Sequence, residues 1–207
     1  SLTLRRGAVF SAPVGAALDL TIGGTLLIES NAVVNVNDKG YPGGSSDSEP
    51  QGPGAGQNEN ESAGSYGGIG GGNTNGPASV YGSFTHPSDF GSGGGQGVIL
   101  AGGLCPGGGG GGSIHLQTEC LHVDGVVSAD SRAGCSAAAG GSGGSVYIVT
   151  GILEGNGAIT ANGGGNYYAG GAGGRVAIYY GDRTTFTGRI EAKGGANSQN
   201  IFRNGGA

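Results

Sequence analysis

The sequence contains few charged residues and no long hydrophobic run. Only 11% of its 207 residues are charged, the formal net charge is -5, and the 9 basic residues are scattered along the chain. Phosphate backbones are bound by concentrated basic stripes, so nucleic acid is not expected as a partner. No apolar run approaches the roughly 18 residues that a membrane-spanning helix needs, so membrane insertion is not expected either.

Proline is also scarce, whereas glycine is abundant. Collagen requires glycine at every third position and much proline, but here the 53 glycines come in runs and there are only 7 prolines. Each glycine inside a helix costs about 1 kcal/mol relative to alanine, which excludes helical bundles and coiled coils. Hydrophobic residues still make up 35% of the chain, more than a disordered Gly/Ser sequence carries. Some segments must therefore bury a core.

The N-terminal residues show no sign of a targeting segment. The chain starts at Ser1 and continues Leu-Thr-Leu-Arg-Arg, without the apolar stretch of a signal peptide. We therefore expect a processed product or an excised piece, with any targeting signal outside this sequence.

An internal repeat of about 31 residues is the most informative feature. Three segments share one pattern of two apolar alternations separated by a turn glycine: 113–130, 145–162 and 175–193. Their second alternations contain Val127, Ile159 and Ile190, which are 32 and 31 residues apart. A fourth copy opens at Leu18 and closes at Val36. Repetition on this scale is typical of proteins built by stacking one structural unit.

The repeat predicts the fold class. Apolar alternation with period two indicates strands with one buried face, and a unit of this size can bury that face only against its neighbours. We therefore predict an all-β protein, a single domain over residues 1–207, folded as a parallel β-helix (β-solenoid). Parallel crossovers are overwhelmingly right-handed, so the coil is expected to be right-handed. A β-sandwich is the rival interpretation, but it gives no reason for near-identical copies.

A glycine-rich insertion, residues 41–112, separates the first copy from the others. Three glycine runs precede successive copies, so they should lie over one another: 107–112, 140–144 and 170–174. Backbone without side chains can approach closely enough for hydrogen bonds between extended, polyproline-II-like segments. We predict a polyglycine-II-like layer against the solenoid, with flexible connectors as the alternative.

Several glycine-rich stretches carry a family resemblance. They read YGSFTHPSDFGSGGG at 81–95, GGGGGGSIHL at 107–116, GGSVYI at 143–148, GAITANGG at 157–164 and GGRVAIYY at 173–180. Together they resemble the glycine-rich parallel β-helix modules of very large secreted and surface proteins of microbes, over roughly residues 15–195. The resemblance implies a role in extracellular architecture, such as surface layers, appendages or adhesive stalks. The three cysteines depart from the bacterial pattern.

Those cysteines, Cys105, Cys120 and Cys135, are evenly spaced. No CxxC-like pair with further ligands is present, so neither a metal site nor any other cofactor is predicted. Cys105 and Cys135 precede their coils by similar distances, and parallel strands about 4.8 Å apart allow a disulfide, so we predict that these two are bonded. The bond would imply an oxidising, extracellular setting. Cys120 is expected to be a small buried hydrophobe, with an intermolecular bridge as the alternative.

No catalytic residue is predicted. His115 and His122 lack a serine or cysteine partner and are expected to be exposed. Polysaccharide lyases also use parallel β-helices, but the acids here stand singly at expected coil corners, as solvated turn residues do: Asp38, Asp124, Asp130, Asp182 and Glu191. Asn60 opens an N-glycosylation sequon. Five tyrosines are expected to form a ladder across coils, with a glycan-stacking strip as the alternative: Tyr147, Tyr167, Tyr168, Tyr179 and Tyr180.

The architecture also predicts a class of function. The ends of a solenoid expose strand edges, which need caps or recruit another copy, and no capping helix is evident. We therefore expect a structural subunit or module of an extracellular filament, appendage or surface layer, whose partner is itself. Candidate contacts are Leu2, Leu4, Ile201 and Phe202. The alternatives are an adhesive or glycan-binding surface module and a polysaccharide lyase-like enzyme.

Overall fold

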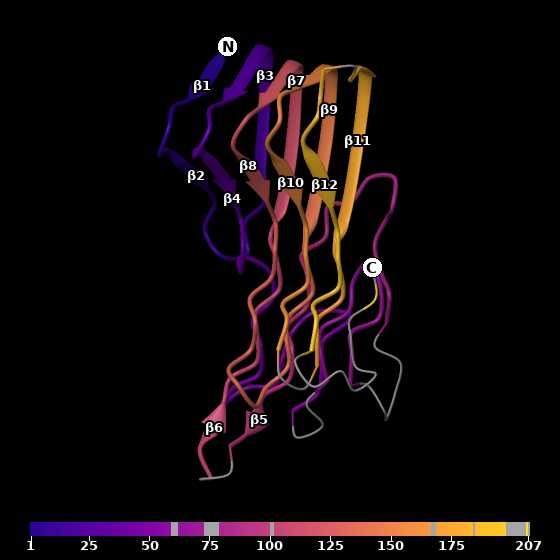
Figure 1. The fold of residues 1–207 in the computed structure, drawn as a ribbon. Coiled ribbons are helices and arrows are strands. Elements are labelled where there is room, and N and C mark those ends of the chain that lie inside the picture. The colour runs from indigo at the N-terminus through magenta and orange to yellow at the C-terminus, as the bar shows by residue number, and fades with distance from the viewer. Residues whose placement is uncertain are drawn as a thin grey trace.

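The computed structural model describes residues 1–58, 62–72, 79–99, 102–166, 169–183, 185–197 and 206. The secondary structure within these ranges consists of strands, without helices, so none of these residues forms a helix able to cross a membrane. Figure 1 shows two parts: the longer strands at one end of the molecule and, at the other, glycine-rich segments that are irregular apart from one short hairpin. The all-β class predicted from the sequence is confirmed.

Two parallel sheets of five strands form the upper part. The first sheet contains, in order, β1 (Leu2–Leu4), β3 (Leu18–Ile28), β7 (Ser113–Val123), β9 (Ser145–Glu154) and β11 (Arg175–Asp182). The second contains β2 (Val9–Ser11), β4 (Val33–Asn35), β8 (Val126–Ser128), β10 (Ala158–Thr160) and β12 (Arg189–Glu191). The chain alternates between the sheets and adds strands to both in sequence order, which is consistent with a β-solenoid (Figure 1).

The register confirms the alignment of the repeats. In the first sheet, Val146 pairs with Ile114 on one side and with Val176 on the other. In the second sheet, Ile159 pairs with both Val127 and Ile190. Apolar positions that are equivalent in sequence therefore form continuous rows from coil to coil.

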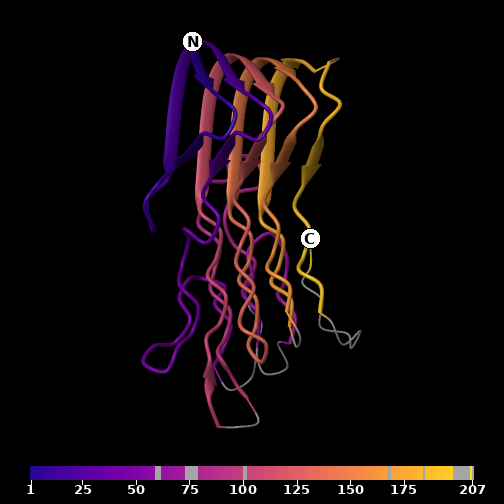
Figure 2. The ribbon, with the colours of Figure 1, turned by 60° about the vertical axis from the view of Figure 1, so that its left-hand side comes forward.

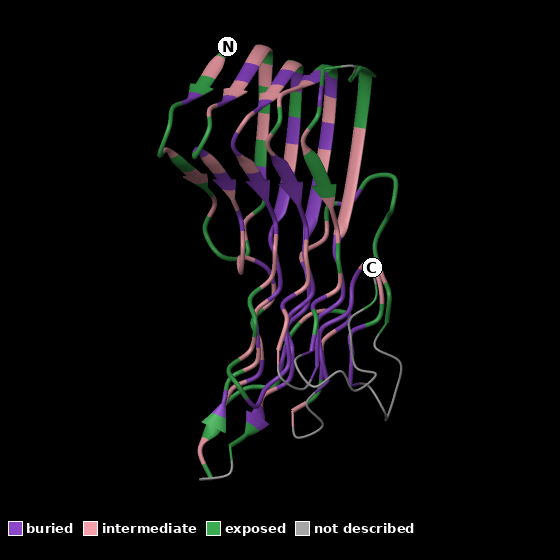
Figure 3. Cartoon of the chain, in the orientation of Figure 1, coloured by how far each residue is buried: buried purple, intermediate pink, exposed green. Residues whose placement is uncertain are grey.

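The core lies between the two sheets and depends on these rows. Val34, Val127 and Ile159 are fully buried in the second sheet, whereas Ile190 on the outermost strand β12 is 41% exposed. Figure 3 shows the same gradient, with buried β8 and β10 beside exposed β12. Burial of apolar surface contributes about 25 cal/mol per Å². Each middle coil is therefore stabilised by the coils on both sides of it.

The glycine-rich segments run side by side below the sheets (Figure 2) and are joined by backbone hydrogen bonds. Segment 139–144 shows the pattern, because its amides donate to three neighbouring segments in turn. The amides at 140 and 143 donate to carbonyls at 169 and 172, those at 141 and 144 to 132 and 129, and those at 139 and 142 to 95 and 92. Every third amide thus faces the same neighbour, which is the three-residue period of a polyproline II helix.

Glycine is required where these segments approach one another. A Cβ atom added at Gly111 would lie less than 3.0 Å from the backbone oxygen of Ala129, and one added at Gly141 would lie equally close to the oxygen of Gly109. Backbone atoms cannot move aside as a flexible side chain can. Larger residues at these positions would therefore force the segments apart.

Two further contacts tie the lower part together. Cys105 and Cys135 form the predicted disulfide bond, with their Cα atoms 5.5 Å apart. It joins strand β6 (Leu104–Cys105), which pairs with β5 (Gly97–Val98) in a small antiparallel hairpin, to the segment that leads to β9. The fully buried Tyr66 shares a 2.7 Å hydroxyl–hydroxyl hydrogen bond with Ser145 at the start of β9. The glycine-rich part is thereby fixed to the first sheet.

Candidate functional site

Residues 81–90 form a loop that crosses the outer face of the first sheet over β9 and β11. The Tyr179 hydroxyl donates to the carbonyl of Thr85 at 3.0 Å, and the Ser145 hydroxyl donates to that of Asp89 at 2.6 Å. Arg175 donates to the carbonyl of Tyr81. These bonds come from outward side chains of both strands, so they hold the 81–90 loop against the sheet.

A group of rings lies beside this loop. The ring of Tyr147 is 5.1 Å from that of His115, 5.2 Å from that of His86 and 5.8 Å from that of Tyr179. The ladder predicted across coils is therefore present at Tyr147 and Tyr179. Tyr180 instead lies beneath the guanidinium of Arg183, at 5.8 Å, and residues 167 and 168 lie outside the described residues.

A cavity of about 290 Å³ opens between the loop and the strands that it leaves uncovered. Asp19 and His115, which are paired in register on β3 and β7, form one wall, with 3.1 Å between Oδ1 and Nδ1. The lining residues are Ala17, Asp19, His86, Pro87, Ser88, Ser113, His115 and Tyr147. Rings, small apolar groups, hydroxyls and one carboxylate thus meet in a single hollow.

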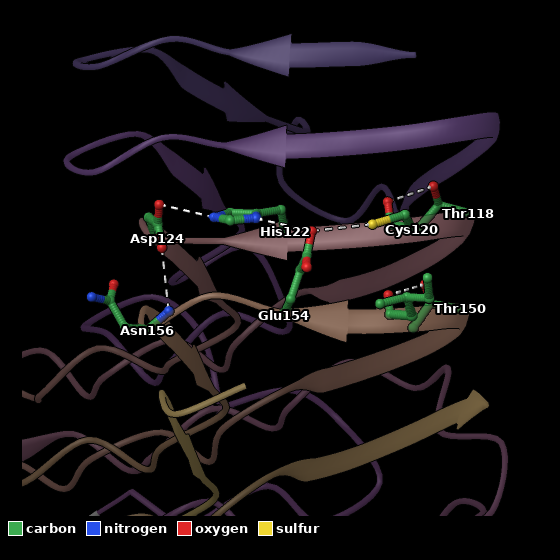
Figure 4. A network of polar contacts seen from close by, with 8 residues as sticks. Thr118, Cys120, His122, Asp124, Thr150, Glu154 and Asn156 are labelled. Atoms are coloured by element: carbon green, nitrogen blue, oxygen red, sulfur yellow. Dashed lines mark hydrogen bonds and ion pairs between the residues drawn. The ribbon is translucent and has the colours of Figure 1, made fainter. Parts of the chain in front are cut away.

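A second polar cluster, on β7 and β9, surrounds His122 (Figure 4). The Nδ1 atom of His122 lies 3.1 Å from Glu154 Oε1, and its Nε2 atom lies 3.0 Å from Asp124 Oδ2. The thiol of Cys120 donates to the same Glu154 oxygen at 3.5 Å. His122 and Glu154 are paired in register, so the cluster links two successive coils.

Partial burial and the two carboxylates act on His122 in opposite directions. Burial lowers the pKa of the imidazole, but its hydrogen bonds to the Glu154 and Asp124 carboxylates outweigh this effect, so the pKa is raised above the usual 6.5. Burial and the Glu154 carboxylate both raise the pKa of the Cys120 thiol. A thiol held in its neutral form is a weak nucleophile. The cluster is therefore suited to an ionic link between coils rather than to covalent catalysis.

Two sequence-based expectations need correction at this cluster. Asp124 does not stand alone at a corner, because it shares His122 with Glu154. Cys120 is not a buried hydrophobe, because it is a free cysteine of intermediate exposure beside a carboxylate. Alternation explains both errors, since residues 120 and 122 point to the outer face, away from the buried Leu121. Among the described residues, no group of three or more His, Cys, Asp and Glu side chains is arranged to hold a metal ion.

The remaining candidate residues are the expected subunit contacts at the ends of the coil stack and the glycosylation candidate. Leu4 is buried on β1, and Leu2 of the same strand packs against the core. Asn60, Ile201 and Phe202 lie outside the described residues. In the described part of the chain, the strands at the two ends of the stack, β1 and β2 at one and β11 and β12 at the other, each pair with a single neighbour. Within these described ranges, each end of the stack therefore has strand edges without a second hydrogen-bonded neighbour.

Comparison with known proteins gives no match to a family model, to a curated protein or to a solved structure.

Proposed function

We propose that the chain is a structural module of an extracellular filament, appendage or surface layer, and that it associates with further copies or modules through the edge strands of its coil stack. The proposal rests on one observation: the row of inward-facing apolar side chains that is buried in the middle coils is partly exposed on β12. Ile159 is fully buried, whereas its register partner Ile190 is 41% exposed. An additional coil at this end would cover Ile190 as β12 covers Ile159.

The backbone favours the same kind of partner. Among the described residues, β11 and β12 have one hydrogen-bonded neighbour each, so their outer edges are free to pair. An added strand would lie about 4.8 Å away and continue the sheet. At the opposite end, Phe10 on β2 is half-buried, while its partner Val34 on β4 is fully buried. Both ends thus offer an apolar row beside a free edge, as head-to-tail addition requires.

The finer architecture belongs to the same proposal. We infer a right-handed coil, because parallel crossovers are right-handed in about 98% of cases. The glycine-rich segments then form a polyglycine-II-like layer, supported by the three-residue period of their hydrogen bonds. The disulfide supports an oxidising, extracellular location, where the sequon at Asn60 is a candidate for glycosylation. The resemblance to glycine-rich microbial β-helix modules agrees with this role.

Sedimentation velocity and electron microscopy of the purified chain test the proposal. We expect concentration-dependent association into linear particles. Ile190→Lys places a charge in the uncovered row and should abolish this association. Gln117→Lys adds the same charge at an exposed, outward position of the central strand β7, so it should leave association unchanged.

Two results would contradict the proposal. The first is a wild-type chain that stays monomeric at high concentration. The second is association that Ile190→Lys and Gln117→Lys weaken equally, because the contact would then not involve the edge at β12.

A further inference from the structure

The cavity beside the 81–90 loop has no part in the proposed association. It opens on the outer face of the first sheet between the loop and β3 and β7, whereas the proposed contacts are strand edges at the ends of the stack. Asp19 is 68% exposed and His115 is 35% exposed, so solvent reaches this wall. The hollow is therefore accessible in a single copy of the chain.

The lining combines two kinds of surface. Ala17, Pro87 and the rings of Tyr147 and His86 give flat apolar area, while Ser88 and Ser113 contribute hydroxyl groups. Asp19 uses Oδ1 for His115, and a carboxylate has further acceptor capacity at its second oxygen. A ligand that fits must present an apolar face to the rings and hydroxyl donors to the carboxylate.

Sugars have this combination of surfaces. One face of a pyranose ring consists of C–H groups, which pack on aromatic rings, and its rim carries hydroxyls that both donate and accept hydrogen bonds. Drug-sized ligands occupy cavities of roughly 300–1,000 Å³, so a cavity of about 290 Å³ suits a small ligand of one or two rings.

Electrostatics restricts the class of sugar. The cavity holds a carboxylate at Asp19, and the chain has a formal net charge of -5. The Asp19 carboxylate would repel an acidic saccharide inside the cavity, and the net negative charge of the chain would repel it at longer distance. We propose that this cavity binds a neutral saccharide unit, with Tyr147 and His86 as the packing rings and Asp19 as the acceptor of its hydroxyl hydrogen bonds.

Calorimetric and NMR titrations test this proposal, with the methyl glycosides of glucose, galactose, mannose and N-acetylglucosamine as probes. The Ile190→Lys background keeps association separate from binding. We expect at least one probe to bind saturably and to shift the amide signals of residues 86, 115 and 147. His86→Ala and Tyr147→Ala should each weaken its binding about tenfold, as the loss of an aromatic contact does.

Two variants serve as controls. Phe84→Ala removes an aromatic side chain that is 77% exposed on the same loop and does not line the cavity, so its affinity should equal that of the parent. Tyr147→Phe keeps the ring and should retain binding. The proposal is overturned if none of the four probes binds saturably, or if His86→Ala and Phe84→Ala bind the probe equally well.

Discussion

At the scale of single residues, the absence of side chains determines how the lower half of the molecule packs. Buried segments normally need apolar side chains, but here buried backbone atoms contact buried backbone atoms. Gly141 donates to the carbonyl of Arg132, and a Cβ atom added to Gly141 would collide with the backbone of Gly109. Satisfied backbone hydrogen bonds replace hydrophobic contacts in this layer.

Substitution of Gly141 by alanine tests this packing. We expect Gly141→Ala to lower the free energy of unfolding by at least about 2 kcal/mol, as overpacking of a tight site does. Gly23→Ala is the matched control, because a Cβ atom there meets nothing within 4 Å and the residue lacks a positive φ. Its effect should stay within about 1 kcal/mol. Urea denaturation measures both, and equal losses in the two variants would refute the close packing.

His122 predicts a pH dependence of stability. Its pKa is raised in the folded state, so its contribution is fully present below the unfolded value of about 6.5 and is lost as the pH rises through the folded value. Lowering the pH from 8.5 to 5.5 should therefore increase the stability of the wild type relative to that of His122→Gln. Urea midpoints at the two pH values measure the effect. A constant difference between the two proteins would show that the imidazole carries no ionic link between coils.

At the scale of elements, the disulfide is the covalent tie between the β5–β6 hairpin and the coil that contains β9. It joins cysteines 30 residues apart. A disulfide that closes a loop of this size raises the free energy of unfolding by about 2–4 kcal/mol. The double variant Cys105→Ala/Cys135→Ala should lose this amount in chemical denaturation. The unreduced, denatured wild type should show one free thiol, that of Cys120, with a thiol reagent. Three free thiols would rule out the bond.

The strands were predictable because their sequence signal is local and repeated. Spacings of 32 and 31 residues align Val127, Ile159 and Ile190, and the observed register joins these residues. The short strand β2 was not predicted, because its three residues carry too little alternation, and its place is set by pairing with β4.

The site residues were less predictable because outward positions have no common pattern. The offset of 32 that aligns the core also pairs His122 with Glu154, so this contact was available from the repeat. The 81–90 loop has no such offset. Its placement depends on tertiary contacts, such as the one between Tyr179 and Thr85, and so the cavity beside it left no signal in the sequence.

At the scale of the whole molecule, the contacts that stabilise the coil stack are of the same kind as those through which we propose that it associates. Among the described strands, those of the middle coils have a neighbour on each side, whereas the outermost strands have one neighbour only. In the proposed association, another copy would make the same kind of contact with the strands at either end of the stack. A polymer formed this way grows along the direction in which the strands stack.

Fibre diffraction from aligned assemblies of the purified chain tests this claim most directly. Growth through edge strands predicts a reflection near 4.8 Å along the fibre axis, because successive strands are separated by about that distance in the hydrogen-bonding direction. A 4.8 Å reflection perpendicular to the axis, or a chain that remains monomeric at every concentration tested, would contradict it.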